Sequence, residues 1–258
     1  MNIIVCVKYS YDVQQIKFDP KTREPMLAAA PKKIGDMDRR ALEEAIRIKE
    51  KMGGTVRVLS IGPPRTEDVA KEAYAMGADE VIVVSDEKLK SDDPNVSAKV
   101  LAELIKKYDY DIILCGAAST DGYNWQVAGK IAAILDLPFL PNTVSMEIAD
   151  GSVVAECDLD DAVYKYKATL PAVVSVSLEI NEPRIPTLSA ILKASRKQYT
   201  KVDLSELGVD VAPEISVSKI SVPEVVRKRI VMDASEPEKI EEAVTKLLDE
   251  LKKEGVLR

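Results

Sequence analysis

The sequence contains no histidine among its 258 residues. Histidine is the commonest general base in enzymes and the commonest transition-metal ligand in proteins. Its absence excludes Ser-His-Asp and Cys-His catalysis and most zinc chemistry, so a hydrolase is disfavoured. We assign no residue of the sequence a catalytic role.

Cysteine is scarce. The three residues, Cys6, Cys115 and Cys157, are an odd number, are widely spaced and form no CxxC pair. A disulfide framework and a thiolate metal site are therefore not expected, and we predict small buried side chains on strands. The acidic residues within 36–44 suit the N-terminus of a helix better than a hard-cation site, so no metal is predicted.

Long apolar runs are also missing. No stretch approaches the ~20 apolar residues of a membrane span, and the run that begins at Met1 meets Lys8 too early for a signal peptide. We expect no membrane insertion and a cytoplasmic location. The net charge of -7 and the pI near 5.0 disfavour a nucleic-acid partner, whereas 46% hydrophobic residues suffice for a sizeable core.

Short apolar runs alternate with helical patterns over the first ~135 residues. The runs, apolar throughout as buried parallel strands are, cover 2–7, 56–60, 80–84 and 111–115. Helical spacing of apolar residues covers 38–52, 66–76, 95–108 and 124–136. This order predicts an α/β fold of the Rossmann-like kind, a wound, mostly parallel sheet with helices on both faces. Any nucleotide is then expected at the carboxyl ends of the strands.

After Pro138 the pattern changes. Antiparallel strands that extend the sheet are predicted over 143–148, 153–157, 162–168 and 172–177, with Asp150-Gly151 as a hairpin turn. From Thr200 the chain carries scattered prolines and charges until a helix with a long apolar stripe over 237–251. We predict a nucleotide-binding α/β domain over 1–199 and a C-terminal arm and helix over 200–258.

The loop from Cys115 to Gln126 joins the fourth strand to a helix. Its small residues let the backbone approach a ligand, and the unpaired N–H groups that open the helix attract an anion. The loop has neither the GxGxxG pattern nor a Walker lysine, so hydride transfer from a dinucleotide and hydrolysis of a nucleoside triphosphate lack their usual signatures. The alternative is an ordinary strand-to-helix turn.

Residues 181–197, NEPRIPTLSAILKASRK, follow an apolar strand. Two prolines stiffen the chain, and Thr187 is placed to cap a short helix that carries Leu188, Ile191 and Leu192 on one face. Basic residues near the helix C-terminus, beginning with Lys193, complement the helix dipole. The pattern fits either a connector helix packed on its own domain or a surface segment that contacts a partner.

This segment resembles the signature of electron transfer flavoprotein beta subunits. The resemblance extends over nearly the whole chain in the family's order, through residues 5–8, ALEEA at 41–45, AMGAD at 75–79, 116–126, LPAVV at 170–174 and LGVD at 207–210. It implies nucleotide contacts, mostly through backbone and apolar groups, at Cys6, Gly35, Asp36, Met37, Asp38, Ile61, Gly116, Ala117, Asp121, Gly122, Tyr123, Asn124, Trp125, Gln126 and Val127.

Two kinds of family member use this site differently. Ordinary members hold a structural AMP, whereas electron-bifurcating members bind a second FAD and use NADH. The bifurcating loop usually reads Asp-Gly-Asp-Thr, and this chain reads Asp121-Gly122-Tyr123-Asn124, which favours AMP. Trp125 stands where family members have a small or amide residue. Its side chain would either crowd a flavin, stack on a ligand ring or pack in the core.

The resemblance also implies partners. An alpha subunit would hold the redox-active FAD, and residues 200–258 would wrap it. Leu188, with Ile191 and Lys193, would dock acyl-CoA or other dehydrogenases. Electrons would pass from these dehydrogenases to a quinone reductase, or in the opposite direction. A competing interpretation from another class is an adenine-nucleotide sensor of the universal-stress type, which needs neither the arm nor an alpha partner.

Overall fold

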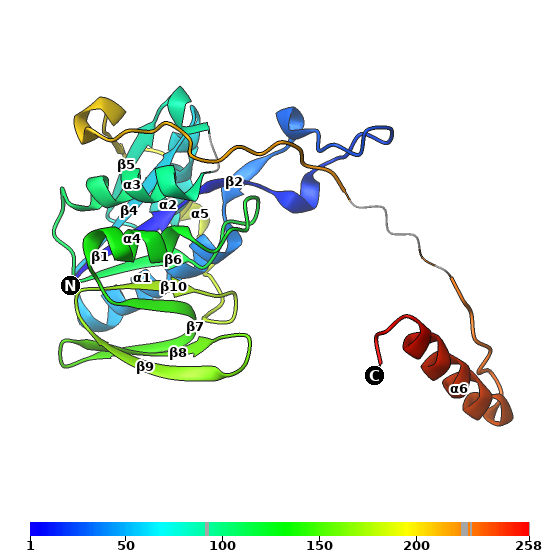
Figure 1. Cartoon of the computed structure of the whole chain (residues 1–258). Helices are drawn as coiled ribbons and strands as arrows, with labels where there is room; N and C mark the ends of the chain where they lie inside the picture. The colour runs from blue at the N-terminus through cyan, green and yellow to red at the C-terminus, as the bar shows by residue number, and fades with distance from the viewer. Residues whose placement is uncertain (91–92, 223–226, 228, 258) are drawn as a thin grey trace. The chain divides into compact units, whose positions relative to one another are not determined.

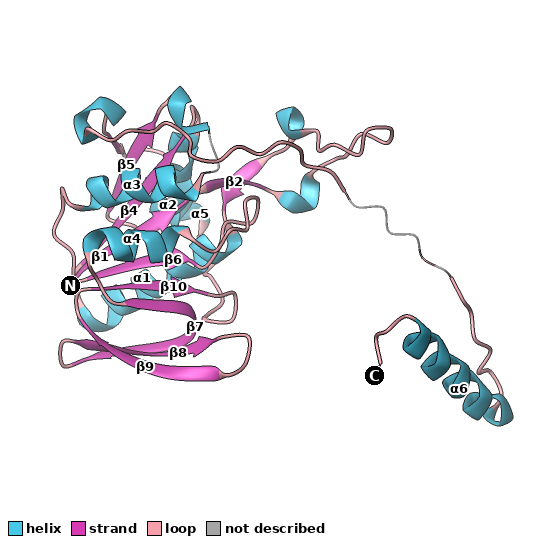
Figure 2. Ribbon diagram, viewed as in Figure 1, coloured by secondary structure: helices cyan, strands magenta, loops and turns pink. Residues whose placement is uncertain are grey.

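A computed structural model describes residues 1–90, 93–222, 227 and 229–257, and these contain one nine-stranded sheet and a short two-stranded one (Figures 1 and 2). The strands of the large sheet are β1 (Asn2–Val7), β4 (Thr55–Gly62), β5 (Glu80–Ser85), β6 (Ile112–Gly116), β7 (Phe139–Ala149), β8 (Ser152–Asp158), β9 (Val163–Thr169), β10 (Ala172–Val176) and β11 (Thr200–Lys201). Their order is β11-β5-β4-β1-β6-β10-β7-β8-β9. β2 (Tyr9–Tyr11) and β3 (Lys32–Ile34) form the small antiparallel pair.

Helices cover both faces of the sheet (Figure 2). They are α1 (Asp36–Met52), α2 (Val69–Met76), α3 (Pro94–Ile105), α4 (Val127–Leu135) and α5 (Leu188–Ala194), with short 3-10 turns at Val13–Gln15, Leu27–Ala29, Thr66–Asp68, Glu87–Lys90 and Leu204–Leu207. β1 shows how the faces divide, because successive strand residues point to opposite sides. Val5 packs in the buried cluster with α1 and α2, and Ile4 packs in the cluster with α3 and α4.

The predicted fold class is confirmed. β11, β5, β4, β1, β6, β10 and β7 pair in parallel, and β8 and β9 form the antiparallel extension. Asp150 and Gly151 make the predicted two-residue hairpin, with φ values of 50° and 68°. Helix starts shift by a few residues: α1 begins at Asp36, and α4 begins only at Val127.

One strand direction was predicted wrongly. Residues 172–177 were expected in an antiparallel strand, but β10 pairs in parallel with both β6 and β7. All five residues of β10 are buried, which a central strand covered on both faces requires. The antiparallel part begins at Thr143, beside Asn142, which has a φ of 40°, and the pairings of β7 with β10 and with β8 both shift register in this region.

The chain forms two compact units, Met1–Ser221 and Val222–Arg258. In the first unit, residues after β11 still join the core, because Val202, Leu204 and Leu207 are buried. The second unit contains α6 (Pro237–Lys253), on which Ala243 is buried while the apolar stripe stays about half exposed. The prediction that residues 200–258 act as a wrapping arm stays a prediction.

Candidate functional site

A cavity of about 510 Å³ opens at the carboxyl ends of β1, β4 and β6. After β1 the chain places β4 and β5 on one side and then returns to place β6 on the other. Such a reversal leaves a crevice between the strand ends, and ligands of open α/β sheets bind there. The volume lies within the range of about 300 to 1,000 Å³ that small-molecule sites have.

The inner wall of the cavity is apolar. Ile61 lies near the carboxyl end of β4, Val96 and Leu101 come from α3, and Val127 and Ala128 open α4. A wall of this kind suits a flat aromatic base, which gains by leaving water. The lining also contains Val7, Lys8, Tyr9, Tyr11, Lys32, Gly62, Pro63, Pro64, Thr66, Glu87, Leu89, Lys90, Ser97, Cys115, Ala118 and Ser119.

Asp38 connects three elements at the cavity. From the first turn of α1, its carboxylate accepts the backbone N–H of Lys8 at 2.9 Å and that of Gly116 at 3.2 Å. Burial raises the pKa of Asp38 to about 7, against the opposing effect of these two hydrogen bonds. The approach depends on glycine, because a Cβ on Gly116 would lie 2.4 Å from Asp38 Oδ1. The aspartate therefore fixes where the loop after β6 begins.

A charged pair forms the polar side of the cavity. Lys8 Nζ lies 2.7 Å from Asp121 Oδ1, and the other oxygen of Asp121 accepts the N–H of Tyr11 at 3.2 Å. Burial opposes ionisation of Asp121, but Lys8 outweighs it and the pKa of the carboxyl is lowered. The pair ties the loop after β6 to the segment after β1 and places a cation at the cavity.

The N-terminus of α4 is the element of this cavity that is suited to an anion. Gln126 at the N-cap position makes no side-chain cap hydrogen bond, and Val127 and Ala128 of the first turn line the cavity. Backbone N–H groups at such an end attract negative charge. Together with the apolar wall, the residues present therefore have the chemistry that an adenine nucleotide requires.

Two aromatic residues stand out of the loop before α4. Tyr123 and Trp125 have φ values of 46° and 59°, their rings meet edge to face at 5.3 Å, and they are 59% and 42% exposed. Core packing therefore does not explain Trp125. A left-handed backbone is costly for such residues, and strain of this kind concentrates at ligand sites.

The cavity brings together part of the predicted site. Eight of the predicted residues line it, namely Cys6, Asp38, Ile61, Gly116, Ala117, Asp121, Asn124 and Val127. Seven do not line it, namely Gly35, Asp36, Met37, Gly122, Tyr123, Trp125 and Gln126. Met37 still touches the loop, since its sulfur accepts the N–H of Ala118 at 3.3 Å. That any of these residues binds a nucleotide stays a prediction.

Sequence reasoning missed part of the wall. Gly62 ends β4, and Pro63 and Pro64 follow it directly, so their position at the carboxyl edge was a usable signal. Leu89 and Leu101 gave no such signal, because apolar residues on a 3-10 turn and a helix read as ordinary core. Only the folded chain shows that these two side chains also border the cavity.

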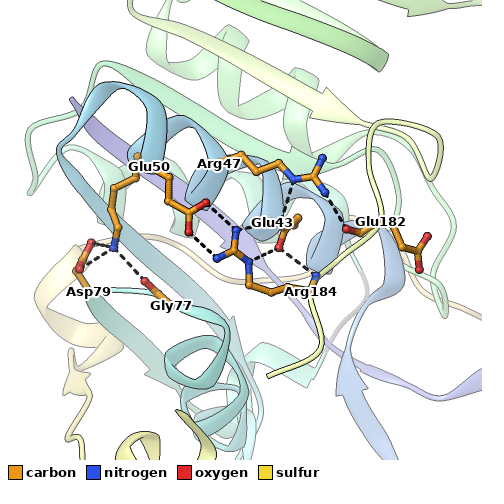
Figure 3. A network of polar contacts seen from close by, with 8 residues as sticks. Glu43, Arg47, Glu50, Gly77, Asp79, Glu182 and Arg184 are labelled. Carbon is orange, nitrogen blue, oxygen red and sulfur yellow. Dashed lines mark hydrogen bonds and ion pairs between the residues drawn. The ribbon is translucent and has the colours of Figure 1, made fainter. Parts of the chain in front are cut away.

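A second feature is the segment 181–187, which an ionic network holds on α1 (Figure 3). Arg184 donates through Nε to Glu43 at 2.8 Å and reaches Glu50 through both terminal nitrogens, at 2.6 and 3.0 Å. Arg47 donates to Glu43 at 2.8 Å and to the carbonyl oxygen of Glu182 at 3.0 Å. We call this segment the clamped arm.

Glu43 is the buried centre of the network. Its side chain is only 3% exposed, and burial opposes its ionisation. Hydrogen bonds from Arg184 and Arg47 outweigh that effect and lower its pKa, while the two glutamates raise the pKa of Arg184. Asp38 and Glu43, two acidic residues within 36–44, thus accept hydrogen bonds from other parts of the same chain. In the described ranges, no group of three or more Cys, Asp or Glu side chains is placed to hold a metal ion.

The clamped arm leads into α5, whose outer face is apolar and exposed. Thr187 caps the helix as predicted, accepting the N–H of Ala190 at 3.2 Å. Ala194 is buried, whereas Ile185 is 92% exposed and Leu188 73% exposed. Ile191 and Leu192 are also about half exposed. The helix therefore packs on its own unit by one side and presents large apolar side chains on the other.

None of the helices in the described part of the chain has the length and apolar composition needed to cross a bilayer.

Comparison with known proteins gives one family. The profile described as the electron transfer flavoprotein domain matches residues 26–207. The electron transfer flavoprotein subunit beta of Thermoanaerobacterium thermosaccharolyticum is 34% identical over 265 residues, covering 100% of both chains. Proteins of the same name from Bacillus subtilis, 34% identical over 81% of this chain and 82% of the relative, and Megasphaera elsdenii, 32% identical over 81% of each, are also similar. The resemblance seen in the sequence is confirmed, and the chain belongs to the family of electron transfer flavoprotein beta subunits.

Proposed function

We propose that this beta subunit holds AMP as a structural nucleotide, while the alpha subunit of a heterodimer carries the redox-active FAD. The observation that carries the proposal is the cavity at the ends of β1, β4 and β6, whose lining combines an apolar wall with the N-terminus of α4. Its groups suit retention of a nucleotide, and the sequence offers no histidine to act on one.

Each part of the cavity has a role in this proposal. The wall around Ile61 and Leu101 takes the adenine. The first-turn amides of α4, starting at Val127, and the ammonium group of Lys8 take the phosphate. Asp38 and Asp121 act on the protein itself, because they hold the loop in the shape that accepts the nucleotide.

Docking of electron-transfer partners is assigned to the exposed face of α5. Leu188 serves as the apolar anchor, Ile191 extends the contact, and Lys193 supplies charge at its edge. Exposed apolar groups of this size on a rigid support are typical of binding hot spots. The proposed partners are acyl-CoA or other dehydrogenases and a quinone reductase.

Residues 200–258 are proposed to wrap the alpha subunit. On α6, Ile240, Val244, Leu247 and Leu248 are 43–48% exposed and repeat at helical spacing. A helix with such a stripe needs a covering surface.

A second candidate is a bifurcating flavoprotein in which the same cavity holds a second FAD. The observation that favours it is the exposed ring pair of Tyr123 and Trp125 beside the loop, because aromatic side chains at this position offer a stacking surface for an isoalloxazine. The universal-stress type of sensor is disfavoured by the family assignment.

Nucleotide content decides between the candidates. The chain is co-purified with its alpha subunit and denatured, and released AMP and FAD are quantified per heterodimer by chromatography. One FAD with one AMP supports the proposal. Two FAD without AMP contradicts it and supports bifurcation, and one FAD without AMP contradicts both. Leu188→Ala is the matched control, because its exposed side chain lies on α5 and the nucleotide content should not change.

A further inference from the structure

Cys6 and Cys115 lie side by side in the wall of the cavity. β1 and β6 are neighbouring parallel strands, and their register pairs Cys6 directly with Cys115. Residues in register on adjacent strands point to the same face of a sheet. Both cysteines line the cavity, both belong to the cluster packed against α3 and α4, and neither is in a disulfide.

The two thiols form one chemical unit. The neighbouring Cys6 side chain, together with burial, raises the pKa of the Cys115 thiol well above its usual value. Cys157 provides an internal contrast, because it lies on β8 beside Thr143 and does not line the cavity.

The strand spacing favours an atom between the sulfurs over a direct bond. Neighbouring strands lie about 4.8 Å apart, and side chains in register on them leave the sheet in parallel, so their Cβ atoms stay about as far apart. A disulfide requires Cβ atoms about 3.5 to 4.5 Å apart, whereas a bridging atom with two sulfur ligands spans a wider separation. In the described part of the chain, no group of three or more metal-binding side chains surrounds the pair. An atom that bridges the two sulfurs must therefore be one that needs only two ligands from the protein.

We propose that Cys6 and Cys115 form a dithiol site for monosubstituted trivalent arsenic, and that arsenic and nucleotide exclude each other from the cavity. In the reaction an arsine oxide, R–As=O, condenses with the two thiols. The two S–H bonds and the As=O bond break, two As–S bonds form, and both protons leave on the oxygen as water. Arsenic stays trivalent, so no oxidant is needed, and the two thiols supply the two sulfur atoms and the two hydrogen atoms that the products require.

The exclusion has a steric cause. The thiols are part of the wall that the proposed function gives to the nucleotide, so a substituted arsenic bound to them occupies the same volume. This part of the inference rests on the proposed function. The dithiol site itself rests only on the strand register and the cavity.

The test uses phenylarsine oxide and the full-length chain. Intact-mass measurement should show one phenylarsine adduct on the wild type and on Cys157→Ser, and none on Cys6→Ser or Cys115→Ser. A measurement without variants accompanies it, in which the adduct is denatured and alkylated and peptide mapping identifies the protected cysteines. Protection of Cys6 and Cys115 together supports the site. Absence of an adduct, or an adduct that persists in Cys6→Ser, overturns it.

Competition with AMP tests the exclusion separately. At an AMP concentration about ten times its dissociation constant, adduct formation should slow about tenfold by mass action. An unchanged rate, in a chain that still forms the adduct on Cys6 and Cys115, overturns the exclusion and with it the placement of AMP in this cavity. If the adduct fails while AMP binds, the dithiol site is wrong and the proposed function stands.

Discussion

Replacement of Arg184 by methionine should loosen the clamped arm. The guanidinium reaches Glu43 and Glu50 with four donor contacts of 2.6 to 3.2 Å, and methionine keeps the aliphatic stem while removing all of them. The consequence for Glu43 decides the magnitude, because its side chain is almost fully buried. A buried carboxylate that loses a charged partner is strongly destabilising.

The structure bounds the size of the effect. Loss of one partner from a fully buried pair costs about 3 to 5 kcal/mol. Glu43 keeps two donors, Arg47 at 2.8 Å and the backbone N–H of residue 184 at 3.1 Å, so the full cost is not reached. Glu50 is 55% exposed, and its share should be about 0.5 kcal/mol. We expect Arg184→Met to reduce the free energy of unfolding by about 2 kcal/mol.

The assay is urea denaturation followed by circular dichroism, with hydrogen exchange of peptides within 181–197 to detect local detachment of the arm. Arg40→Met is the control, because the Arg40 side chain bonds the 87% exposed carboxylate of Glu182, and the backbone carbonyl that accepts from Asn181 is unchanged in the variant. Its effect should stay below about 0.5 kcal/mol. The reasoning fails if the two variants lose equal stability and show equal exchange. It also fails if Arg184→Met and Glu43→Gln are additive, since partners in one network should couple by about 1 kcal/mol.

Three further predictions concern the cavity and α5. The pKa of Asp38 is raised in the folded state, so the carboxyl of the unfolded chain ionises first as pH rises. The free energy of unfolding should therefore fall by up to about 4 kcal/mol between about pH 4 and pH 7. Urea titrations at several pH values should show that Asp38→Asn removes this slope. Gly116→Ala should lower the melting temperature and the nucleotide content, because the added Cβ would collide with Asp38. Gly129→Ala is the control and should be near neutral, because its Cβ would meet only the edge of the Phe139 ring at 3.3 Å. Leu188→Ala should change the free energy of unfolding by less than about 0.5 kcal/mol, because the side chain is exposed. It should slow the reduction of the heterodimer's flavin by an acyl-CoA dehydrogenase and its substrate. A large fall in stability would show that the Leu188 side chain belongs to the core.

The sequence predicts the first half of the fold well because two periodicities agree there. Apolar runs such as 2–7 and helical stripes such as 38–52 alternate, and the alternation itself implies the parallel sheet. The direction of β10 was missed because a strand after a hairpin meander is expected to continue it. The sequence AVVSV carried the contrary signal, because a strand with one exposed face alternates apolar and polar residues and this one does not. All five of its residues are buried.

The candidate site was predictable only in part, for a physical reason. Residues at strand ends, such as Ile61 and Gly116, are placed by topology alone. Leu89 and Leu101 depend on how a turn and a helix pack over the sheet, which no local pattern encodes. The pairing of Cys6 with Cys115 depends likewise on a strand order that brings residues 109 positions apart together.

The signature segment 181–197 combines two kinds of residue that a sequence cannot separate. Asn181 and Arg184 face inward and bind α1, whereas Ile185 and Leu188 face outward and touch little. The inward pair explains how the outward pair stays ordered, because large exposed apolar groups have no packing of their own to fix them. α1 gains a double role from this arrangement. Its first turn holds the loop after β6 through Asp38, and its later turns hold the clamped arm, so a single rigid helix supports both the proposed nucleotide site and the proposed docking face.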